Sequence, residues 1–66
     1  MYEGPVIEID GLTSEQFHKA LISVAIMLNR TMGTAFTYKD DWDRLENLCR
    51  VLGITFDTEG NILNYG

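Results

Sequence analysis

The chain contains very few of the residues that build catalytic or metal sites or that staple a small domain together. Its 66 residues include one cysteine, one histidine and one proline. A single cysteine excludes an internal disulfide, and one histidine with one cysteine argues against a closed zinc site. The sequence also lacks a glycine-rich phosphate loop, a nucleophile elbow and a paired-cysteine motif. We therefore expect a protein that is not an enzyme and that binds no metal or cofactor.

Basic residues are half as numerous as acidic ones, 5 against 10, which gives a net charge of −5. An acidic field repels phosphate, so we expect no direct contact with nucleic acid. The bases all fall in two segments that we expect to be helical, where acids of the same segments balance them. The acids of the terminal segments have no base near them in sequence; they are Glu3, Glu8, Asp10, Asp57 and Glu59. We expect these acids to gather on one side of the folded chain.

Long hydrophobic runs are absent as well. The most apolar run, from Ala20 to Leu28, is interrupted by Ser23 and is too short to span a bilayer. No charged segment precedes a cleavable apolar segment, so we expect neither a membrane partner nor secretion. A lone thiol fits the reducing environment of the cytoplasm, which is the expected location.

A chain of this length forms a single domain, spanning residues 1–66, and buries only about 60% of the surface that its unfolded form exposes. Ordering such a chain costs nearly as much free energy as its core returns. Because disulfides and metals are excluded, stability must come from tight packing or from oligomerisation. We expect a homo-oligomer, since the segment from Ala20 to Leu28 is apolar on more than one side of a helix.

The clearest local signals define this first helix. Thr13 and Gln16 are spaced as a capping box at its start, and Gly33 is placed to end it in the left-handed conformation. Its main apolar stripe comprises Phe17, Leu21, Val24, Leu28 and Met32. At roughly 100° per residue, Ile22 and Ile26 point away from that stripe. The helix therefore presents apolar side chains on its back as well as toward the core.

A second helix is expected through Leu52, with Thr37 as its N-cap and Gly53 as the residue that ends it. This helix is amphipathic, and its apolar side comprises Tyr38, Trp42, Leu45, Leu48, Cys49 and Leu52. The acids and bases opposite are spaced for salt bridges, Asp40 with Arg44 and Glu46 with Arg50. We interpret the cluster of Asp40, Asp41, Asp43 and Glu46 as this solvated face rather than as a metal site.

Short strands flank the two helices. Alternation from Val6 to Asp10 predicts a half-buried strand with Ile7 and Ile9 toward the core. Near the other end, Thr58-Glu59-Gly60 is predicted to be a hairpin loop with Gly60 at positive φ. The hairpin register pairs Phe56 with Ile62 and Ile54 with Asn64. The expected fold is α+β: a small βααββ domain with a three-stranded, mainly antiparallel sheet and two helices packed on one face.

Two reactive side chains have simple structural explanations. Cys49 lies at the centre of the second helix's apolar side, where a buried thiol is unreactive. A general base needs a nucleophile or carboxylate beside it, but Ser14 and Glu15, which lie near His18 in sequence, belong to the helix cap. We therefore expect His18 to be a solvated or interface histidine.

Two apolar surfaces exceed what a monomer needs. The first, on the back of the first helix, comprises His18, Ile22, Ile26 and Asn29. The second, on the outer face of the sheet, comprises Val6, Leu63 and Tyr65, with Tyr2 nearby. Each surface has two possible explanations. Either it is covered within the monomer, the first surface by crowding in the fold and the second by the N-terminal arm, or it is an interface with a partner.

These features favour a small, acidic, non-enzymatic protein-binding module that associates with itself and with another protein. By analogy of size and charge, such domains act as inhibitors or adaptors, for example those of phages and mobile elements. One alternative is an oligomer that sequesters a nucleotide or metabolite through Tyr38, Lys39, Arg30 or Arg44. The other is an inhibitor that mimics DNA with its uncompensated acids.

Overall fold

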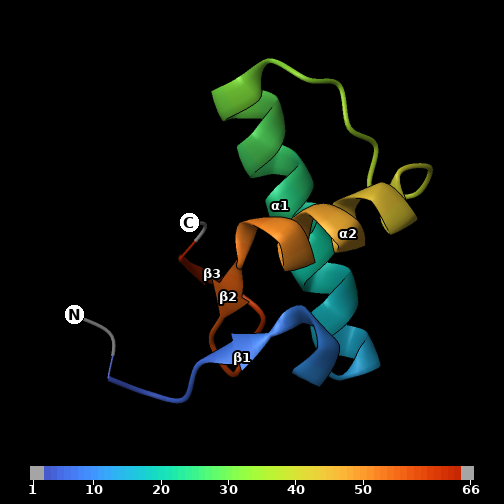
Figure 1. Cartoon of the computed structure of the whole chain (residues 1–66). Coiled ribbons are helices and arrows are strands. Elements are labelled where there is room, and N and C mark those ends of the chain that lie inside the picture. The colour runs from blue at the N-terminus through green and yellow to red at the C-terminus, as the bar shows by residue number, and fades with distance from the viewer. Residues whose placement is uncertain (1–2, 65–66) are drawn as a thin grey trace.

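The computed structural model describes residues 3–64 and has the α+β fold predicted from the sequence. Its elements, in chain order, are β1 (Ile7–Glu8), a single 3₁₀ turn η1 (Ile9–Gly11), α1 (Ser14–Met32), α2 (Trp42–Leu52), β2 (Thr55–Phe56) and β3 (Ile62–Asn64). In Figure 1, α2 crosses in front of α1, and the three short strands lie together beside the helices. No helix within the described residues is both long and apolar enough to cross a membrane.

The sheet has the order β1-β2-β3, and both neighbouring pairs are antiparallel. β2 is therefore the central strand, and Phe56 pairs with Ile7 on one side and with Ile62 on the other. The predicted pairing of Ile54 with Asn64 is wrong, because Thr55 pairs with Asn64 instead. A bulge between Thr55 and Phe56 inserts one extra residue into the ladder and shifts the register.

The first strand is shorter than the predicted range Val6–Asp10. Only Ile7 and Glu8 pair, because β2 offers just two residues as partners. The chain then turns at once into η1, and this turn keeps Ile9 buried in the core. The predicted inward orientation of Ile9 is thus confirmed, although it lies in a 3₁₀ turn and not in a strand.

Both ends of α1 follow the sequence signals. The Thr13 hydroxyl accepts a hydrogen bond from the Gln16 backbone N–H, and the Gln16 side-chain carbonyl accepts one from the Thr13 N–H. This reciprocal pair satisfies two N–H groups that the helix itself leaves free. Gly33 ends the helix in the left-handed conformation, with a φ of 67°.

The start of α2 differs from the prediction. Thr37 does not cap the helix, which begins at Trp42 with Asp41 in the N-cap position. The Thr37 carbonyl accepts hydrogen bonds from the N–H groups of Asp40 and Asp41, and the Asp41 carboxylate accepts one from the Thr37 N–H at 3.0 Å. These bonds close a separate turn before the helix, since an aspartate side chain competes with helical bonding. Gly53 ends α2 as predicted.

One core joins the two helices to the sheet. Its buried members are Ile9, Ala20, Leu21, Val24, Ala25, Leu28, Leu45, Cys49, Ile54 and Phe56. Ile54 and Phe56 are two residues apart and point to the same side of the β2 segment, and both helices pack against that side. Two residues predicted to be buried are exposed instead: Met32 at 62% and Leu52 at 40%. Each is the last residue of its helix, where the chain turns away from the core.

Candidate interaction surface

The back of α1 carries a groove of about 430 Å³ on the side opposite its buried stripe. Its lining residues recur at intervals of one helical turn and are Ser23, Ile26, Met27, Arg30 and Thr31. Ile26 is one of these lining residues and is 55% exposed. Helical periodicity makes this arrangement, because residues three and four apart share one face of a helix.

The four residues predicted to form this surface do not act as one patch. Ile26 is exposed, whereas Ile22 is half-buried and lies between the groove and the core. His18 is exposed, but its ring meets the Trp42 ring edge-on, with 4.6 Å between centroids. His18 therefore belongs to an aromatic cluster where the starts of the two helices meet, together with Phe17.

Asn29 has an intramolecular role that its sequence context does not reveal. Its side-chain N–H donates to the Phe36 carbonyl at 3.0 Å, and its side-chain oxygen accepts from the Phe36 N–H at 2.7 Å. Both backbone polar groups of one loop residue are thus satisfied by a single side-chain amide. Asn29 fastens the connection between the helices to the last turns of α1, where Arg44 also stacks over the Phe36 ring at 4.7 Å.

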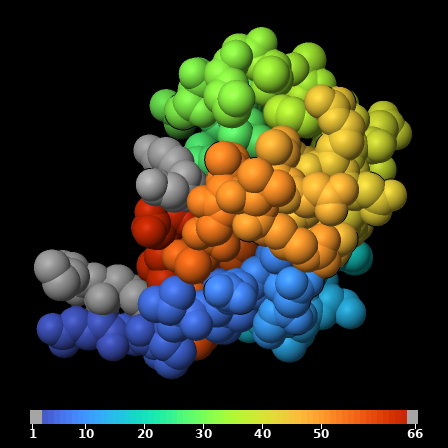
Figure 2. Space-filling view, in the orientation of Figure 1, coloured from blue at the N-terminus to red at the C-terminus, as the bar shows by residue number. Residues whose placement is uncertain are grey.

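The second predicted surface is partly described. Leu63 is half-buried in β3, whereas Tyr2 and Tyr65 lie outside the described residues. Val6, just before β1, is 61% exposed. The blue segment that leads into β1 runs out from the body of the molecule in Figures 1 and 2, and residues 3–6 are all exposed.

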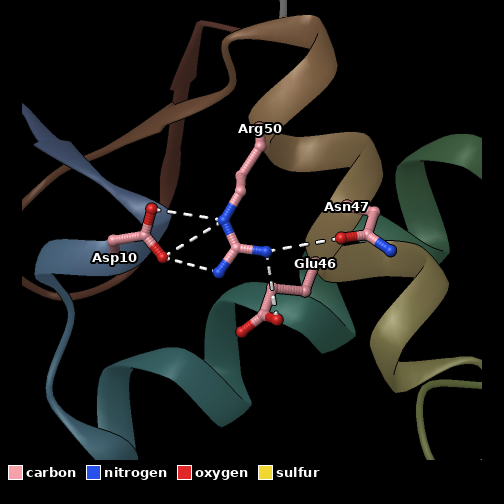
Figure 3. Close-up of polar contacts among 4 residues, drawn as sticks. All are labelled: Asp10, Glu46, Asn47 and Arg50. Atoms are coloured by element: carbon pink, nitrogen blue, oxygen red, sulfur yellow. Dashed lines mark hydrogen bonds and ion pairs between the residues drawn. The ribbon is translucent and has the colours of Figure 1, made fainter.

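One acid that was expected to lack a base is in fact paired. The Arg50 guanidinium donates to both carboxylate oxygens of Asp10, with the shortest contact at 2.7 Å, and also to Glu46 and Asn47 (Figure 3). The hydrogen bonds from Arg50 lower the pKa of Asp10, and the carboxylate in turn raises the pKa of Arg50. This contact joins η1 to the end of α2.

The predicted salt bridges on α2 are half correct. Arg50 pairs with Glu46 as expected, at 3.2 Å. Arg44 pairs with Asp41 rather than with Asp40, also at 3.2 Å, because Asp41 lies at the start of the helix and Asp40 belongs to the preceding turn.

A second terminal acid, Asp57, builds the hairpin loop. Its carboxylate accepts hydrogen bonds from the N–H groups of Glu59 and Asn61 and from the Asn61 side chain. The Asn61 backbone bond is the main reason that the pKa of Asp57 is lowered. Gly60 has the predicted positive φ, at 84°. Since Asp10 and Asp57 both have structural partners, fewer acids remain for the imitation of a phosphate backbone.

A polar hollow of about 520 Å³ lies where this hairpin loop meets the start of α1. Its lining residues are Glu15, Gln16, Lys19 and Glu59. Gln16 joins the two elements, because its side-chain N–H donates to the Thr58 carbonyl. Two acids against one base disfavour a phosphate ligand here. None of the residues predicted to hold a nucleotide or metabolite lines this hollow.

Cys49 is 1% exposed, as its place in the sequence pattern predicted. Burial, followed by the nearby Glu46 charge, raises the pKa of its thiol to about 11, so the reactive thiolate is scarce at neutral pH. Within residues 3–64, no three His, Cys, Asp or Glu side chains are grouped so as to hold a metal ion.

One exposed apolar residue was not among the predicted surfaces: Val51, near the end of α2, is 80% exposed. The signal was present, because Val51 falls between polar positions on the outer side of that helix. No known protein family, curated protein or solved structure matches the chain. Its function must therefore be inferred from these surfaces.

Proposed function

We propose that the chain is a non-enzymatic protein-binding module that associates with itself through the exposed face of α1. The observation that carries this proposal is the position of Ile26, which is exposed and lines a groove on the longest described helix. Lys, Glu or Gln would form helix at least as well at such a position. A β-branched apolar side chain is useful there when a partner covers it.

The energetic gain from covering this side chain is modest but sufficient to matter. Full burial of an isoleucine is worth roughly 1.5–3 kcal/mol, so covering the exposed half of Ile26 contributes about 1 kcal/mol per contact. Met27, half-buried in the same groove, adds to the apolar area that a partner removes from water. A micromolar Kd corresponds to about −8.2 kcal/mol, so these two side chains supply part of the binding free energy and the rest of the contact must supply the remainder.

The biological role that we propose is an inhibitor or adaptor acting on another protein in the cytoplasm, of the kind that phages and mobile elements encode. The support for this role is the small size of the chain and its net charge of −5. A net charge of this size keeps such a domain soluble. A reduced, buried Cys49 is compatible with that compartment.

The test compares Ile26→Lys with Val51→Lys, which places the same charge on another exposed helical position. Sedimentation at micromolar concentration should show a multiple of 7.5 kDa for the parent and for Val51→Lys. Ile26→Lys should sediment as a monomer with an unchanged helical circular dichroism signal. A monomeric parent over the whole concentration range would refute self-association. Assembly that survives Ile26→Lys and is lost in Val51→Lys would move the contact to α2.

A further inference from the structure

We infer that the outer side of β1 in one copy docks onto the α1 groove of a second copy, with Val6 against Ile26 and Met27 and Glu8 paired with Arg30. This inference rests on the self-association proposed above and names the two surfaces that meet. The occupant of the groove is thus a second copy of this chain, recognised by opposite charge and matching apolar area.

The groove side of the contact carries Arg30, a basic side chain without a partner in an acidic protein. The other two arginines are engaged, Arg44 with Asp41 and Arg50 with Asp10. The Arg30 side chain, in contrast, has no hydrogen bond, ion pair or ring contact with any residue in the range 3–64, and it is exposed beside Ile26. The groove therefore offers one apolar and one positively charged contact point next to each other.

The β1 side of the contact carries the complementary pair of side chains, the apolar Val6 and the acidic Glu8. Val6 and Glu8 are two residues apart, so in extended backbone they point to the same side, opposite to Ile7. Val6 is 61% exposed, and Glu8 is exposed and has no salt bridge with any described residue. Because the segment before β1 stands out from the body of the molecule, a second copy can approach it (Figure 2).

The spacings of the two pairs agree. Two residues in a strand span about 7 Å, which separates Val6 from Glu8 along the chain. Four residues in a helix rise about 6 Å, which separates Ile26 from Arg30. When Val6 lies against Ile26, the Glu8 carboxylate therefore lies within reach of the flexible Arg30 guanidinium, which prefers a carboxylate partner.

The two surfaces are different, so the contact is heterologous. Each copy carries one β1 side and one groove side, so copies join into a ring if the rotation between them closes and into an open filament if it does not. This arrangement joins one exposed residue from each apolar surface expected from the sequence, Val6 and Ile26.

The experiment reverses each charge and then both together. Glu8→Arg places two arginines opposite each other, and Arg30→Glu places two glutamates opposite each other. Each single variant should weaken association by about tenfold or more at low salt. The double variant restores an opposite-charge pair, so it should associate within about threefold of the parent. An equimolar mixture of the two single variants should also assemble, because each contact between the two different variants joins opposite charges.

Lys39→Glu and Asp40→Arg provide matched controls. They make the same changes in net charge at exposed positions away from both surfaces and should leave association unchanged. If either reversal reduces the helical signal, the neutral variants Glu8→Gln and Arg30→Gln replace it, and association should then weaken by a smaller factor.

The outcomes separate the two proposals. A parent that associates while neither reversal weakens it, or a double variant that fails to recover, would overturn this contact and leave self-association in place. A parent that stays monomeric would remove both. Recovery by the double variant, with both controls unchanged, would establish the contact of Glu8 with Arg30.

Discussion

Replacement of Asn29 by alanine should destabilise the fold strongly although the side chain lies near the surface. The side-chain amide makes two hydrogen bonds to the backbone of Phe36, one to its carbonyl at 3.0 Å and one to its N–H at 2.7 Å, in a partly buried position. Each bond is worth about 1 kcal/mol, and the half-buried peptide left without a partner costs about a further 0.5–1 kcal/mol. Alanine returns about 0.5 kcal/mol through its higher helix propensity. The net loss in the free energy of unfolding should be about 2 kcal/mol.

Such a loss is large for a domain of this size, because it corresponds to a fall in Tm of about 8–16 °C. Urea unfolding should be followed by the fluorescence of Trp42, the only tryptophan, and by circular dichroism at one fixed protein concentration. Asn47→Ala is the matched control, since it has the same gain in helix propensity. Its side chain is exposed, and among residues 3–64 it is hydrogen-bonded only to Arg50, at 3.4 Å.

The difference between the two variants isolates the contribution of the Phe36 peptide. We expect Asn47→Ala to lie within about 0.5 kcal/mol of the parent, as surface substitutions usually do. If Asn29→Ala were as stable as Asn47→Ala but failed to associate, Asn29 would be an interface residue, as the sequence pattern predicted. The hydrogen bonds to Phe36 would then contribute little to the fold.

Three further results are expected. Gly60→Ala should lower the free energy of unfolding by about 1–2 kcal/mol or more, since φ is 84° and a Cβ would lie 2.9 Å from the Gln16 carbonyl; unchanged stability in urea would show that the hairpin does not pack on α1. Cys49 should react slowly with a thiol reagent in native buffer and at least about a hundredfold faster in denaturant, and equal rates would contradict its burial. The pKa of Asp57 lies below its ordinary 3.8, so its stabilising effect is present above that pH and is lost as the pH falls through the lowered value. Asp57→Asn should therefore flatten the acid side of the stability profile, and an unaltered profile would argue against the loop hydrogen bonds.

Most signals that act within one or two helical turns predicted the structure correctly, although Thr37 does not cap α2. The capping box of Thr13 and Gln16 and the left-handed Gly33 and Gly53 need only local geometry, so their spacing was enough to place them. The same holds for the buried position of Cys49, because helical periodicity alone assigns it to the apolar side of α2.

The candidate interaction surface depends on contacts between segments that are far apart in sequence, and only the tertiary structure determines these contacts. Asp10 meets Arg50 across 40 residues of chain, and no local pattern reports that pairing. Asn29 and Ile26 both fall off the core stripe of α1, yet the fold brings a loop peptide to Asn29 and leaves Ile26 exposed. Sequence periodicity determines which way a side chain points from its own helix. What it meets there depends on where the rest of the chain is packed.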